Sequence, residues 1–102
     1  MINKVSDITY HDIADYIRVD TNDKNTIYEL NNYLNIAKSF ISSYTGIPLT
    51  GDGENLDSYP EFVIVVYVLC QDMHDNRSMY VDEKNLNKVV QIALGMHAKN
   101  NL

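Results

Sequence analysis

His11, Asp12 and Asp15 are close enough in the sequence to bind a metal ion together if they lie on one helix. Residues three or four apart project from neighbouring turns of a helix, and His11 and Asp15 are four apart. Histidine and aspartate are common metal ligands, but two ligands do not complete a site. An exposed polar helix face explains the pattern better, so we predict no metal site here.

Asp72, His74 and Asp75 form a second group of this kind. Asp72 and Asp75 are three residues apart and could hold a cation, but an ion pair with Arg77 or a solvated helix face is the better explanation. Three further acids lack the spacing of a calcium-binding loop and are expected to keep the chain soluble: Asp52, Glu54 and Asp57. We predict no metal site at either place.

The sequence has no arrangement typical of an enzyme. Nucleophilic catalysis needs an activated Ser, Thr or Cys with a base in reach, and neither a nucleophile-elbow motif nor a Cys-His signature is present. The four glycines form no phosphate-binding loop followed by a lysine. We therefore predict that the chain is not an enzyme and binds no cofactor.

The charge balance and the single cysteine limit the remaining possibilities. Eight Lys and Arg oppose fourteen Asp and Glu, which gives a net charge of -6 and argues against tight nucleic-acid binding. Cys70 has no partner for a disulfide, so we predict a buried apolar side chain from a reducing compartment. The apolar run that contains it, 62–70, is far shorter than the ~20 residues that cross a bilayer. We expect a cytosolic chain or part of a particle assembled in the cytosol, and no membrane partner.

Tyrosine dominates the aromatic residues, with eight Tyr, two Phe and no Trp. Its apolar ring and polar tip suit surfaces that are wet on one side. Two interpretations stay open: these residues form the edges of a small core, or they form a surface that binds a partner.

Periodicity predicts an all-α fold of a single domain, 1–102, in which helices position the residues above. Apolar residues recur at the three- and four-residue spacing of buried helix faces. The expected elements are four helices at about 9–19, 26–45, 59–75 and 82–97, with a loop at 46–57.

The ends of the expected helices carry capping signals. Thr9 with Asp12 fits the start of the first helix. Thr26 with Glu29 reads as a capping box for the long central helix, and Gly46 as the left-handed residue that ends it. Two more starts are expected at a Ser58–Glu61 capping box around Pro60 and at Asp82.

The sequence predicts the third and fourth helices less directly than the first two. The run after Pro60 is β-branched and could form a buried strand, but its cap and length favour a helix that is buried or faces a partner. The last helix is expected to bury Leu86, Val89, Val90, Ala93, Leu94 and His97.

Four segments in succession resemble the small head-tail connector (adaptor) family of long-tailed bacteriophages and prophages. They are the first helix ending in Tyr16-Ile17-Arg18-Val19-Asp20, the central helix running into Tyr44-Thr45-Gly46-Ile47-Pro48-Leu49, the buried helix after Pro60, and its ending in His74-Asp75-Asn76-Arg77.

The resemblance implies an all-helical protein that forms a ring between the portal and the tail after DNA packaging. Its partners would be the portal protein, tail-side head-closure proteins and further copies of itself, in the virion and before that in the cytoplasm of the host bacterium. The positions it singles out are structural or possible interface residues: Tyr44, Gly46, Pro48 and Arg77. A small terminase-like DNA-packaging or regulatory protein is the alternative.

Overall fold

Helices make up the regular structure of this chain, as predicted. The computed structural model describes residues 2–97 and contains no strand in that range. Its α-helices are α1 (Tyr10–Ile17), α2 (Lys24–Thr45), α3 (Phe62–Asp75) and α4 (Lys88–Gly95). Three short 3-10 helices precede or connect them: η1 (Val5–Asp7), η2 (Leu56–Ser58) and η3 (Glu83–Asn85).

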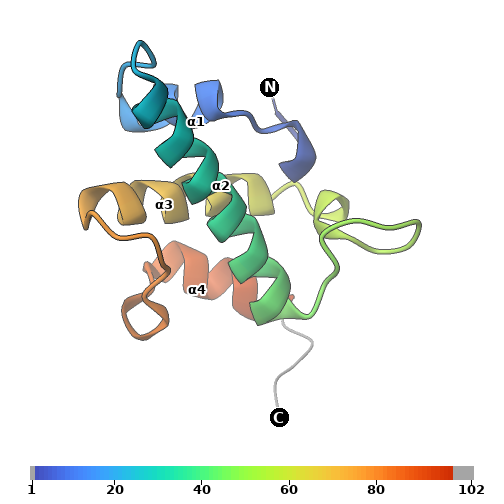
Figure 1. Cartoon of the computed structure of the whole chain (residues 1–102). Helices are drawn as coiled ribbons and strands as arrows, with labels where there is room; N and C mark the ends of the chain where they lie inside the picture. The colour runs from blue at the N-terminus through green and yellow to red at the C-terminus, as the bar shows by residue number, and fades with distance from the viewer. Residues whose placement is uncertain (1, 98–102) are drawn as a thin grey trace.

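The long helix α2 crosses α3 and α4, while α1 and α4 lie on opposite sides of α3 (Figure 1). Helix α3 packs against all three other α-helices and is the centre of the core. Half of its residues are buried, among them Phe62, Val65, Leu69 and Cys70. The β-branched run after Pro60 is therefore a helix, because burial against three neighbours outweighs its strand propensity.

The start of α1 agrees with the prediction and its end does not. Thr9 and Asp12 form a capping box in which the Thr9 backbone amide donates to Asp12 Oδ2 at 2.8 Å. The helix ends at Ile17 rather than 19, because Arg18 adopts the left-handed conformation with φ 61°.

The predicted start of α2 is wrong by two residues. Asp23, not Thr26, is the N-cap, and its carboxylate accepts a 2.8 Å hydrogen bond from the Asn25 amide. Thr26 and Glu29 lie inside the helix, because an effective cap is available earlier in the turn. The predicted end is confirmed: Gly46 has φ 77° and donates its amide to the Ser42 carbonyl at 2.8 Å.

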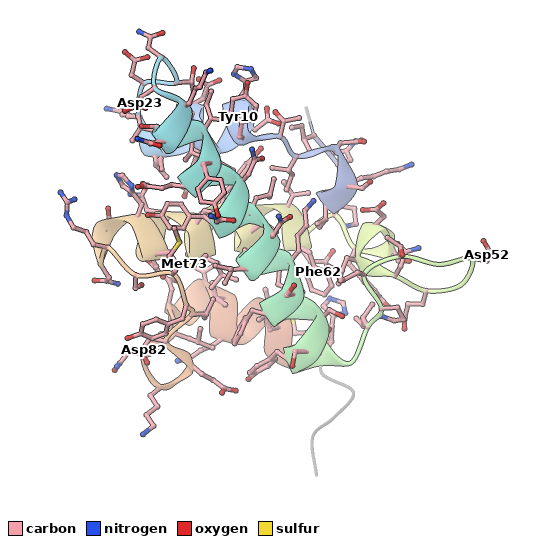
Figure 2. The ribbon with its side chains drawn as sticks, viewed as in Figure 1. Tyr10, Asp23, Asp52, Phe62, Met73 and Asp82 are labelled. Carbon is pink, nitrogen blue, oxygen red and sulfur yellow. The ribbon has the colours of Figure 1, made fainter. Side chains whose placement is uncertain are left out.

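The segment after Gly46 is shorter than the predicted 46–57 loop. Leu56 is buried, and its amide donates to the Pro48 carbonyl at 3.1 Å, which closes the loop. Asn55 caps η2 by accepting from the Asp57 amide at 2.8 Å. The loop tip around Asp52 projects away from the helices (Figure 2).

The Ser58–Glu61 capping box is a wrong prediction. Ser58 is the last residue of η2, and its hydroxyl accepts from the Asn55 amide at 3.2 Å, so it is not available to cap α3. Glu61 occupies the N-cap position of α3 without a side-chain cap bond, and α3 begins at Phe62 rather than 59. Asn55 has taken the capping role because it lies before a buried leucine that starts its own turn.

The last helix begins six residues later than predicted. Asp82 caps η3 instead, where its carboxylate accepts from the Lys84 amide at 3.2 Å. Asn87 caps α4 by accepting from the Val89 amide at 2.8 Å. Leu86, between the two caps, is extended with ψ 141°, so a continuous helix from 82 is interrupted.

The far end of α4 is tied to the start of α3. His97 Nε2 lies 2.7 Å from Glu61 Oε2, and the His97 ring packs on Tyr59 and Phe62 with centroids 4.3 and 5.2 Å away. A hydrogen bond of the Glu61 carboxylate with its own backbone, together with His97, lowers the pKa of Glu61. These contacts fix the carboxyl end of α4 against the amino end of α3.

Candidate functional site

The acids and histidines that suggested metal binding are not assembled into a site. Within residues 2–97, no group of three His, Cys, Asp or Glu side chains could hold a metal ion. Asp12 is engaged in capping α1, and the His11 ring lies against Tyr10 at a centroid distance of 4.2 Å. Asp75 accepts from Gln71 at 2.9 Å, whereas the His74 ring meets Tyr33 edge-on.

Cys70 is fully buried in α3, as predicted. Burial raises the pKa of its thiol to about 12, with Lys38 acting weakly in the other direction. The thiol therefore stays protonated at neutral pH and is a packing group rather than a nucleophile.

The loop acids have structural partners that sequence reasoning did not assign. Asp57 accepts two hydrogen bonds from Ser6, and the Tyr59 hydroxyl donates to Glu54. Asp52 is exposed. Asp57 and Glu54 therefore have structural contacts in addition to the solubilising role expected of these acids. Ser6 lies 51 residues from Asp57 in the sequence, so no local pattern could have revealed this pair.

The four positions singled out by resemblance occupy two separate parts of the molecule. Tyr44, Gly46 and Pro48 gather at the carboxyl end of α2, where the Tyr44 ring packs on Phe40 at a centroid distance of 5.6 Å. Arg77 follows the carboxyl end of α3, and Figure 1 shows that the carboxyl ends of α2 and α3 lie on different sides of the molecule.

Arg77 occupies a defined helix-ending position. It has φ 51°, its amide donates to the His74 carbonyl at 3.2 Å, and the Ser78 amide donates to the Met73 carbonyl at 2.9 Å. This is a Schellman motif with an arginine in the left-handed position usually held by glycine. The guanidinium is exposed near the negative end of the α3 dipole, where a cation is favoured.

An apolar stripe on α4 is exposed. Val89, Ile92 and Met96 are 52%, 63% and 75% exposed, and their spacing places them along one side of the helix. The prediction that Val89 is buried is wrong: Val90 and Leu94 fill the core, and Val89 lies beside them on the solvent side. The sequence carries a pattern that could have predicted this α4 stripe: Val89, Ile92 and Met96 form a second set of apolar residues, spaced by three and four, next to the buried set.

A second exposed apolar area lies where α1 meets α3. Tyr16 stacks on Tyr67 with ring centroids 5.1 Å apart, and Ile64, one turn before Tyr67, is 43% exposed. Burial raises the pKa of the Tyr67 phenol, and Asp12 adds to the effect. We call Tyr16, Ile64 and Tyr67 the tyrosine patch. Tyr33 is buried in the core, whereas Tyr16 is exposed, so the core explains only part of the tyrosines and the partner-binding interpretation stays open for the exposed ones.

No helix among residues 2–97 is long and apolar enough to cross a membrane. Comparisons with protein-family models, with curated proteins and with solved structures found no match. The basis for a functional assignment is therefore the chain's own surfaces and charge, together with the order of its motifs.

Proposed function

We propose that this chain is a structural subunit of a virion, forming a ring adaptor between the portal and the tail of a long-tailed phage or prophage after DNA packaging. The succession of segments that resembles the head-tail connector family supports this role. The all-α fold is compatible with it, since the buried third helix and the glycine-ended second helix lie in the expected order.

The observation that carries the proposal is the pair of unlike apolar surfaces. A ring needs heterologous contacts, in which one surface of each subunit meets a different surface of the next. The α4 stripe lies on α4, and the tyrosine patch lies where α1 meets α3. Because α1 and α4 lie on opposite sides of α3 (Figure 1), the two surfaces belong to different parts of the subunit, as a head-to-tail contact requires.

The size of these surfaces favours assembly on a template. A stable protein-protein interface buries about 800 Å² on each partner. Three exposed side chains in the α4 stripe supply only part of such an area. We therefore propose that copies close into a ring on the portal, where contacts with the portal add to contacts between neighbours.

The charge of the chain fits a channel through which DNA passes. A net charge of -6 repels the phosphate backbone and would let DNA slide, whereas a basic lining would hold it. The alternative, a small terminase-like packaging protein, would have to bind DNA despite this charge.

The proposal is tested by mixing the purified chain with the portal protein encoded in the same genome and imaging the complex by negative-stain electron microscopy. We expect a ring of extra density on the tail-side face of the portal. Ile92→Asp places a charge in the α4 stripe and is expected to abolish the ring. Asn35→Asp adds the same charge at an exposed polar position of α2 and should leave it intact.

Two outcomes would count against the ring. One is a portal that stays bare at saturating concentrations of the wild-type chain. The other is equal loss of density with Asn35→Asp and Ile92→Asp, which would show that added charge, and not the α4 stripe, decides the result.

A further inference from the structure

A pocket of about 500 Å³ lies between the carboxyl half of α3 and the segment 78–87. After α3 ends, this segment turns back and runs beside α3 to the start of α4 (Figure 1). Met73 on α3 and Asp82 on the returning segment mark the two sides (Figure 2). The volume lies within the roughly 300–1,000 Å³ range of ligand pockets in proteins.

The inner wall of the pocket is apolar. Leu69 and Met73 of α3 are buried, and Leu86 from the returning segment is half-buried. Tyr80 lines the pocket but is 64% exposed, and Met79 beside it in the sequence is 46% exposed, so apolar surface extends outward from this side.

The Asp72 carboxylate lines the pocket without a hydrogen-bond or ion-pair partner among residues 2–97. The Asp72 side chain is half-buried. Burial raises the pKa of Asp72, and the neighbouring Asp75 raises it further. Asp82 also lines the pocket, but its carboxylate already accepts hydrogen bonds from the Lys84 backbone amide and from the side-chain amide of Asn85.

The charge in the pocket has one sign, since no Lys, Arg or His is among its lining residues. A complementary group would be a cation on an apolar stem. An arginine side chain has both parts: its methylene groups pack on apolar surface, and its guanidinium binds a carboxylate and stacks on aromatic rings. Its five donors can also use amide oxygens such as that of Asn76 at the pocket wall.

We propose that this pocket binds an arginine side chain of a partner protein, with the stem on Leu69 and Met73 and the guanidinium at Asp72. The occupant is a protein side chain rather than a free cation because Tyr80 and Met79 offer exposed apolar surface that only the residues flanking the arginine would cover. The site does not depend on the role at the portal, since any partner with an exposed arginine meets its requirements.

The test is a titration of the ¹⁵N-labelled full chain, followed by NMR, with the peptide acetyl-Gly-Leu-Arg-Leu-Gly-amide. We expect saturable shifts of the amides of residues 69–87. Replacing the arginine by citrulline, which is neutral and almost the same shape, should weaken binding about tenfold, the effect of losing one charge-assisted contact.

Two protein variants separate the pocket from general electrostatics. Asp72→Asn should weaken binding of the arginine peptide about tenfold, because it removes the unpaired carboxylate without changing its shape. Asp75→Asn removes the same charge from a residue one helical turn after Asp72 that does not line the pocket. It should change the affinity for the arginine peptide less than twofold. Both variants should keep the wild-type spectrum away from the substitution.

Three results would show that the pocket does not bind an arginine side chain. They are an arginine peptide that gives no saturable shifts at residues 69–87, a citrulline peptide that binds equally well, and unchanged binding to Asp72→Asn. Agmatine, a free alkyl-guanidinium, distinguishes the source of the cation. Tighter binding of agmatine than of the peptide would identify a small-molecule site and contradict the protein partner.

Discussion

The Ser6 hydroxyl donates a 2.6 Å hydrogen bond to Asp57 Oδ2, and the Ser6 amide donates a 2.9 Å hydrogen bond to Asp57 Oδ1. This two-point contact joins η1 to η2 across 51 residues of sequence. It fixes the amino-terminal segment against the end of the loop that leaves α2, beside the buried Val5 and Leu56.

Ser6→Ala should therefore lower the free energy of unfolding by about 1 kcal/mol, the usual value of one hydrogen bond to a partly exposed acceptor. Urea denaturation followed by circular dichroism measures the change. Asp52→Asn alters another acid of the same loop, at an exposed position, and should stay within about 0.5 kcal/mol of the wild type. An equal effect of the two substitutions would show that the Ser6–Asp57 contact contributes nothing specific.

The same contact should make stability depend on acid pH. Burial acts to raise the pKa of Asp57, but the two hydrogen bonds from Ser6, helped by Lys4 and Lys38, outweigh it and lower the pKa. A lowered pKa in the folded state means that the stabilisation is present above the ordinary pKa of aspartate and is lost as pH falls through the folded value. Wild type and Asp57→Asn should differ at pH 7 and converge at about pH 2. A difference that persists unchanged at low pH would contradict this.

Asp72 should behave with the opposite sign. Burial raises its pKa, so its ionised form disfavours the folded state, and the penalty disappears as pH falls below the ordinary pKa of aspartate. We expect Asp72→Asn to be more stable than the wild type at pH 7, with the advantage shrinking on acidification. Thermal unfolding of both proteins between pH 3 and pH 7 measures this. A variant less stable than the wild type at pH 7 would mean that the carboxylate makes a favourable contact in the fold.

Arg18 holds a strained backbone conformation at the end of α1. Its φ of 61° is left-handed, a conformation that costs a non-glycine residue about 1–2 kcal/mol. Glycine avoids this cost, but it loses more conformational entropy on folding, which offsets part of the gain. Arg18→Gly should therefore stabilise the fold by about 0.5–1 kcal/mol. Arg18→Ala removes the same charge but keeps the strain, so it should not stabilise. Equal denaturation midpoints for the two variants would assign the effect to charge instead of backbone strain.

The helical fold could be predicted because hydrophobic periodicity and the α1 and Gly46 caps are local signals. The helix starts were less predictable because good capping residues lie close together. Asp23 precedes Thr26, Asn55 precedes Ser58, and Asn87 follows Asp82, and the choice within each pair depends on which turn the core can bury.

The surfaces were harder to predict than the helices. Helix α4 is apolar on two sides, so the sequence could not decide whether Val89 lies with Val90 in the core or with Ile92 in solvent. The pocket at Asp72 exists only because the segment 78–87 turns back against α3, and that contact leaves no local pattern. Tertiary packing decides both cases.

The most direct test of the proposed role is completion of DNA-filled heads. A lysate from a phage or induced prophage that lacks this gene should contain packaged heads that cannot join tails. Adding the purified chain should restore infectious particles, counted as plaques; Asn35→Asp should do the same and Ile92→Asp should not. Plaque counts that stay at background with the wild-type chain, or that are already normal without it, would contradict a place for this protein between the portal and the tail.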